Sequence, residues 1–60
     1  MKIRIYNGYG VSKESRDFCF SSLKLYVSSD YLIGYILPEE IIEGAWIRDT
    51  CLLVIPGGRD

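Results

Sequence analysis

The sequence predicts one small α/β domain with parallel strands, and three observations support this. Strand-like apolar segments at residues 2–6, 31–37 and 51–55 alternate with segments of helical pattern. Each connection is long enough to hold a helix, which parallel pairing of successive strands requires. Sixty residues provide for at most one small domain. The predicted order is therefore strand, helix, strand, short helix, strand.

The first strand is expected at Lys2–Tyr6, where K-I-R-I-Y alternates between charged and apolar or aromatic residues. An internal strand of a parallel sheet should be apolar on both faces. Lys2 and Arg4 are therefore open to two interpretations. Either their aliphatic chains are buried while the charged groups reach the sheet margin, or this strand is less central than predicted. The turn Asn7-Gly8-Tyr9-Gly10 ends the strand.

A helix is expected from Lys13 to about Ser28, with Ser12 as its N-cap and Glu14 in its first turn. At 100° per residue, its polar side chains gather in one arc of about 100°, and its apolar side chains spread over most of the remainder. The helix therefore needs cover on two sides. A sheet face supplies one of them, and the other implies a neighbouring helix.

The second strand is expected at Tyr31–Leu37, and Pro38 suits the first turn of a short helix that Gly44 ends. Trp46 and Ile47 can extend the contacts of that helix. The last strand, Cys51–Ile55, is an unbroken apolar run typical of a strand buried on both faces of a parallel sheet. One substantial helix is too little to cover such a sheet. We therefore expect residues 1–60 to be the N-terminal portion of one larger, incomplete α/β domain.

Composition excludes several classes of protein. Seven Lys and Arg against eight Asp and Glu give a formal charge of −1, and these scattered cations argue against a nucleic-acid partner. No signal peptide is visible, and the longest apolar run is far too short to span a membrane, so we expect a cytoplasmic protein without a membrane partner. Two cysteines without histidine exclude a tetrahedral zinc site. Cys19 and Cys51 are expected to be reduced core thiols.

Two glycine turns are the candidate ligand-binding elements. Asn7, Gly8 and Gly10 follow the first strand, and Gly57 and Gly58 follow the third. In an open parallel sheet both turns lie at the carboxyl edge, where ligands bind. Successive backbone N–H groups of a Gly-Gly pair can form an anion nest or an oxyanion hole. The alternative is that these glycines only permit tight turns.

Other chemistry is poorly supported. Lys13 stands where the third glycine of the dinucleotide motif G-x-G-x-x-G should be, and the phosphate-binding motif G-x-x-x-x-G-K-[ST] is absent. No histidine is available to activate a thiol. The carboxylates of Glu39, Glu40 and Glu43 are explained by a solvated helix N-terminus. We expect no catalytic residue and no metal ligand in this segment.

Four features together carry a family resemblance. They are I-R-I-Y-N-G-Y-G-V-S at residues 3–12, the Ser22-Leu23 step, the single Trp46, and C-L-L-V-I-P-G-G-R-D at residues 51–60. Together they resemble the N-terminal domain of eukaryotic-type biotin-protein ligases. That domain is similar to class I glutamine amidotransferases, so the resemblance implies part of a flavodoxin-like three-layer fold. Tyr9 departs from the family pattern, which has proline there.

The resemblance also implies roles for the site residues. Gly57 and Gly58 correspond to the turn that supplies oxyanion-hole donors in amidotransferase-like relatives. The nucleophilic cysteine of such relatives lies on a later elbow, beyond Asp60, and neither Cys19 nor Cys51 matches it. Biotin and ATP are bound by a separate downstream domain in ligases of this kind. The segment is thus expected to bind neither cofactor and to carry no complete chemistry.

Two functions from different classes follow. The first is the amidotransferase-like segment of a biotin-protein ligase, an ATP-dependent enzyme, with a regulatory or substrate-positioning role and with the rest of its own domain as partner. The second is a free-standing interaction module that homo-oligomerises through its sheet edge and apolar helix face.

Overall fold

The computed structural model describes residues 1–56, and its elements follow the predicted order. They are β1 (Lys2–Tyr6), α1 (Lys13–Tyr26), β2 (Leu32–Ile36), α2 (Pro38–Glu43), the 3-10 helix η1 (Ala45–Arg48) and β3 (Thr50–Val54). The three strands form one parallel sheet in the order β2-β1-β3. This is the order of the first three strands of flavodoxin-like sheets, so the predicted α/β class and parallel pairing are confirmed.

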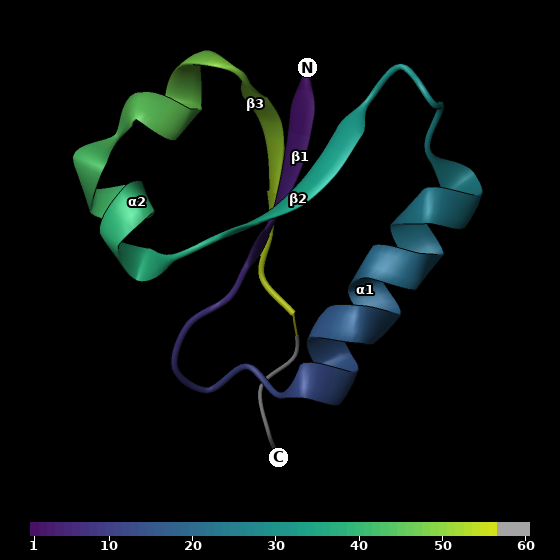
Figure 1. The fold of residues 1–60 in the computed structure, drawn as a ribbon, viewed down its shortest axis with the longest axis horizontal. Coiled ribbons are helices and arrows are strands. Elements are labelled where there is room, and N and C mark those ends of the chain that lie inside the picture. The colour runs from purple at the N-terminus through teal and green to yellow at the C-terminus, as the bar shows by residue number, and fades with distance from the viewer. Residues whose placement is uncertain (57–60) are drawn as a thin grey trace.

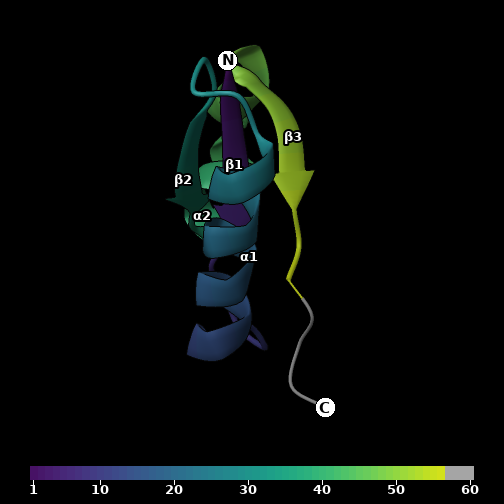
Figure 2. The same ribbon diagram turned by 90° about the vertical axis from the view of Figure 1, so that its right-hand side faces the viewer.

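The helices cover opposite faces of the sheet. In Figure 1, α1 lies on one side of the strands and α2 on the other. Turned by 90°, Figure 2 shows the three strands side by side, with α1 in front of them. Because β2 and β3 flank β1 on opposite sides, two crossovers of the same hand place their helices on opposite faces. The result is a slab of 31 × 30 × 11 Å, three layers deep and only three strands wide.

The central strand supplies most of the buried core. Ile3 and Ile5 of β1 are 4% and 0% exposed, and Ile36 of β2 is also fully buried. Ile5 is in register with Tyr35 of β2, and the Tyr35 ring stacks on Phe20 of α1 with the centroids 5.6 Å apart. Paired residues of neighbouring strands project from the same face, so Ile5 lies between the sheet and α1.

Both α-helices begin and end at recognisable caps. The backbone N–H of Ser15 donates to the side chain of Ser12, as expected for an N-cap. Helix α1 ends at Tyr26, two residues earlier than predicted, because Val27 is extended. Helix α2 begins at Pro38 and ends before Gly44, whose φ of 84° is the left-handed conformation that favours glycine. The limits predicted for α2 are thus confirmed.

The prediction that the third strand is buried on both faces is wrong for the described part of the chain. β3 starts one residue earlier than expected and pairs only with β1. As an edge strand it leaves Cys51 exposed and Leu52 48% exposed. Cys51 is therefore not a core thiol here, whereas Cys19 on α1 is half-buried. An apolar strand of this kind predicts that protein layers cover both of its faces. The three-strand slab does not provide that cover for β3.

Both cations of the central strand β1 form ion pairs with one residue, Asp49. β1 is the central strand, yet Arg4 donates through Nε to Thr50 Oγ1 at 2.9 Å and lies 3.4 Å from Asp49 Oδ1. Lys2 Nζ lies 3.3 Å from the other carboxylate oxygen of Asp49. Partial desolvation raises the pKa of Asp49, but hydrogen bonds from Lys2 and Thr50 lower it more, so it falls below its ordinary value of 3.8. Both cations thus pair at the start of β3.

We expect Asp49→Asn to destabilise the protein at pH 7 and to have a smaller effect near pH 3. A carboxyl group whose pKa is depressed by folding contributes stability above its unfolded pKa and loses that contribution as pH falls through its folded pKa. Urea unfolding midpoints of both proteins at the two pH values measure the difference. Asp30→Asn is the control, since Asp30 forms no ion pair in residues 1–56. Equal destabilisation by Asp49→Asn at both pH values would contradict the role of this ion pair.

We expect Ile5→Ala to lower the free energy of unfolding by about 3 kcal/mol, because it removes buried methyl groups and leaves a cavity. Ile42→Ala, at a residue 85% exposed, is the control and should change it by less than about 0.5 kcal/mol. Denaturant titration checks both. Similar effects for the two substitutions would show that β1 is not the centre of the core.

Candidate functional site

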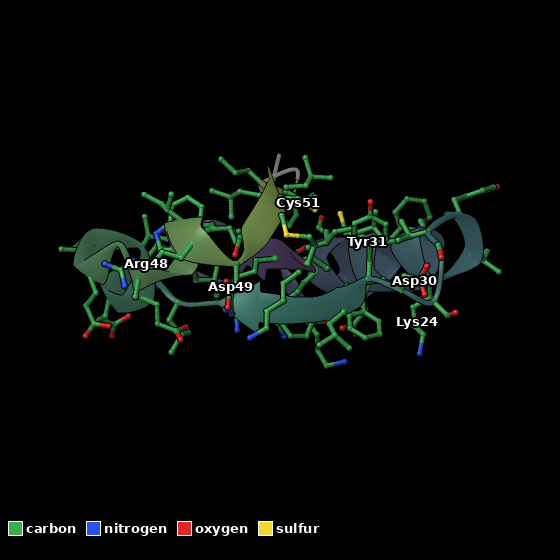
Figure 3. All side chains as sticks on the ribbon, turned by 90° about the horizontal axis from the view of Figure 1, so that it is seen from above. Lys24, Asp30, Tyr31, Arg48, Asp49 and Cys51 are labelled. Carbon is green, nitrogen blue, oxygen red and sulfur yellow. The ribbon has the colours of Figure 1, made fainter. Side chains whose placement is uncertain are left out.

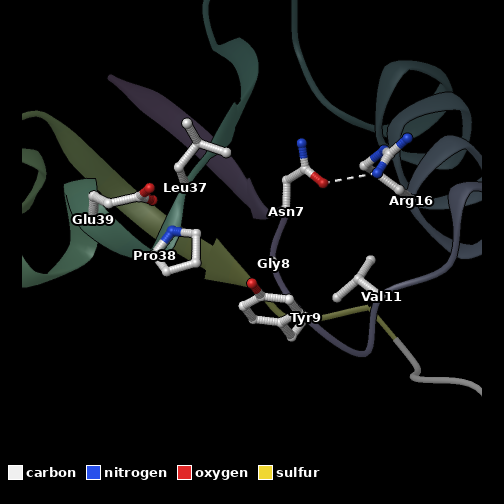
Figure 4. A pocket seen from close by; sticks show the side chains of 8 residues that line it. All are labelled: Asn7, Gly8, Tyr9, Val11, Arg16, Leu37, Pro38 and Glu39. Carbon is white, nitrogen blue, oxygen red and sulfur yellow. Dashed lines mark hydrogen bonds between the residues drawn. The ribbon is translucent and has the colours of Figure 1, made fainter.

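A cavity of about 410 Å³ lies at the carboxyl ends of β1 and β2. Figure 4 shows its walls, which come from the turn after β1, the first turns of α1 and the start of α2. This is the edge of a parallel sheet where ligands generally bind. The lining residues are Asn7, Gly8, Tyr9, Val11, Arg16, Leu37, Pro38 and Glu39.

The turn after β1 is held in place by backbone hydrogen bonds. The N–H of Asn7 donates to Ile36 O at 2.9 Å, which joins the turn to β2. The N–H of Val11 donates to Gly8 O at 3.3 Å, and Gly10 has a φ of 85°. These contacts fold residues 7–11 back over the ends of two strands, so the turn forms a wall of the cavity.

Gly8 lies where no side chain fits. A Cβ atom at this position would overlap the hydroxyl of Tyr6 and lie 2.8 Å from Cγ of Pro38. The absence of a side chain therefore lets the turn pack directly against the first residue of α2. The φ of Gly8 is not positive, so the requirement is close approach and not backbone conformation.

Arg16 is the principal charged group of the cavity on the α1 side. Its Nη1 donates to Asn7 Oδ1 at 2.7 Å, and its guanidinium carbon lies 5.8 Å from the centroid of the Tyr35 ring. A guanidinium over an aromatic ring is attracted to the ring quadrupole. Two neighbours therefore fix the position of this cation at the cavity wall.

Sequence reasoning missed Arg16. It was not among the predicted site residues, yet it lies on the side of α1 that faces the sheet, over Tyr35 of β2 and four residues before Phe20. The available signal was a cation one helical turn before an aromatic residue of the apolar arc, because a long side chain so placed can extend along the sheet with its charge at the edge. Its partner Asn7 was predicted as a site residue.

The predicted site residues are only partly brought together. Asn7 and Gly8 line the cavity, whereas Gly10 shapes the turn without lining it. Gly57 and Gly58 lie outside the described residues, so the anion nest or oxyanion hole expected there stays a prediction. Neither Cys19 nor Cys51 lines the cavity. Within residues 1–56, no group of three potential metal ligands comes together.

We expect Gly8→Ala to destabilise the protein by about 1–3 kcal/mol, as overpacking does, and to displace the Pro38 ring. Gly34→Ala is the matched control, because a Cβ there would meet no atom within 4 Å. Alanine is favoured over glycine in a strand, so this control should be neutral or stabilising. Thermal unfolding of both variants checks the contrast. An equal loss for both would mean that Gly8 is not closely packed.

Comparison with known proteins assigns the chain to a family. The sequence model of the family described as "Biotin-protein ligase, N terminal" matches residues 1–60. The biotin–protein ligase of Schizosaccharomyces pombe is 38% identical over 60 residues, which are 100% of this chain and 10% of that protein. The chain therefore spans about a tenth of the length of the curated relative that it matches. No solved structure matches it significantly.

No helix in residues 1–56 has the length and apolar character that crossing a membrane requires.

The family match covers the turn after β1, the cavity and the apolar third strand together. The chain belongs to the biotin-protein ligase N-terminal family.

Proposed function

We propose that this chain is the opening part of an amidotransferase-like domain in a biotin-protein ligase, and that the domain has a regulatory or substrate-positioning role. The observation that carries the proposal is the open β3 edge. Leu52 is 48% exposed and Ile55 is 70% exposed, and Cys51 lies beside them. An apolar edge of this kind favours pairing with a further strand.

The helix layer supports the same proposal. Phe18 and Leu25 of α1 are 72% and 79% exposed, and their spacing of seven residues places them on one side of the helix. Figure 3 looks along the strands and shows Lys24 toward the β2 margin of the slab, away from β3. If the domain continues past β3, its added layers would cover apolar side chains such as Phe18 and Leu25. Lys24, at the opposite margin, would remain in contact with water.

A positioning role agrees with the side chains at the cavity. Both cysteines lie away from it, and the described residues place no nucleophile beside a base there. A nucleoside triphosphate is disfavoured in the cavity, because Glu39 would repel its phosphates and Arg16 is the single cation that residues 1–56 contribute to the wall. We therefore assign contacts with biotin and ATP to other parts of a ligase.

A second candidate is an interaction module that homo-oligomerises through the β3 edge and the exposed side of α1. The same exposed residues favour it, since two copies could cover each other's apolar surface. The two candidates differ in what covers β3. In the first it is the chain's own domain, and in the second it is another copy.

Hydrogen exchange of the protein at its natural length distinguishes the candidates. If β3 pairs with a further strand of its own domain, the β3 amides that do not bond to β1 exchange slowly at every protein concentration, while the outward amides of β2 exchange fast. The β2 amides serve as the internal control. Slow exchange that appears only as concentration rises, together with a dimer by light scattering, would favour the second candidate. Fast exchange of β3 at all concentrations would contradict both.

A further inference from the structure

The cavity between the turn after β1 and α2 carries opposite charges on its two sides. Figure 4 shows Arg16 on one side and Glu39 on the other, beside Leu37 and Pro38, with Asn7 and Tyr9 between the two sides. Both charged residues line the same cavity, yet no ion pair joins them. A molecule that bridges them would satisfy both charges at once.

Arg16 is prepared to bind a carboxylate. A guanidinium has five N–H donors in a planar fork, and in residues 1–56 one hydrogen bond is formed, from Nη1 to Asn7 Oδ1. No carboxylate of the described residues forms an ion pair with it. Because Asn7 and the Tyr35 ring already fix the group, a ligand loses little by ordering it. The remaining donors suit a bidentate carboxylate.

Glu39 determines what the other end of the ligand must be. Its side chain is exposed at the opposite wall and forms no hydrogen bond or ion pair with the described residues, whereas Glu40 next to it accepts from the N–H of Leu37 at 2.8 Å. A free carboxylate at the wall attracts an ammonium group and repels a second anion. An inorganic phosphate or a simple fatty acid is therefore disfavoured.

Most of the uncharged side chains that line the cavity are apolar or aromatic. Val11, Leu37 and Pro38 line it together with the exposed ring of Tyr9. The cavity is wide open to solvent, and its volume of about 410 Å³ is within the range of pockets that hold small molecules. Short alkyl segments gain from contact with such a wall.

We propose that this cavity binds a small zwitterion in which an apolar segment separates a carboxylate from an ammonium group. The carboxylate contacts Arg16 and Asn7, the alkyl segment contacts Leu37 and Pro38, and the ammonium group contacts Glu39. The site is built from described residues and uses no part of the predicted glycine turn at Gly57 and Gly58, which lies outside them. It rests on residues 7–39 alone, so its failure would leave the domain assignment unaffected, and failure of that assignment would leave this site intact.

Calorimetric titration of the protein at its natural length tests the proposal. The probes are 4-aminobutanoate, 5-aminopentanoate and 6-aminohexanoate. Hexanoate and inorganic phosphate are the comparison ligands, because each is an anion without an ammonium group. We expect one of the three zwitterions to bind at least tenfold more tightly than hexanoate and phosphate, because it alone satisfies both walls. Equal binding of hexanoate, tighter binding of phosphate, or no binding of any zwitterion would overturn the proposal.

Three variants assign the two ends of the ligand. Glu39→Gln should remove the preference for the zwitterion over hexanoate without weakening hexanoate. Glu43→Gln is the matched control, since Glu43 is exposed on the same helix and does not line the cavity, and it should keep the preference. Arg16→Gln should weaken both probes at least tenfold.

Glu39 is exposed, so its substitution tests the site without disturbing the core. Circular dichroism verifies that the Arg16 variant is folded. The proposal is wrong if Glu39→Gln and Glu43→Gln change the preference equally.

Discussion

Parallel pairing of β1 with strands on both sides is the constraint on which the rest of the structure depends. Because β1 is central, Ile3 and Ile5 are covered by strands on two sides and by a helix on a third. The crossovers that parallel pairing requires then place α1 and α2 on opposite faces. The core is small, and it lies where these layers meet β1.

The same pairing creates the cavity. Parallel strands bring the ends of β1 and β2 to one edge, so the turn that starts at Asn7 meets the turn that ends at Pro38. Gly8 lets these turns touch, and Arg16 reaches the edge from α1. The walls thus come from three separate segments of the chain. Arg16 and Glu39 place opposite charges on two of these walls, and no ion pair joins them.

The slab carries one α-helix on each face, and among the described residues β3 has a sheet neighbour on one side only. A strand with one neighbour leaves half of its backbone groups without a sheet partner. Leu52 and Ile55 add apolar area to that edge. The chain matches the family model along its whole length and spans about a tenth of the S. pombe ligase.

Local patterns in the sequence determined the elements, because caps, turns and apolar periodicity act over a few residues. Ser12, Pro38 and Gly44 predicted helix limits correctly, and the alternation of strands and helices predicted parallel pairing. The glycine turn predicted one wall of the cavity. Exposure of Cys51 was not predictable, because an apolar strand has the same sequence whether its cover is present or absent. The ion pairs of Asp49 and the placement of Arg16 beside Asn7 were decided only by tertiary structure, since they join residues whose proximity depends on strand order and helix rotation.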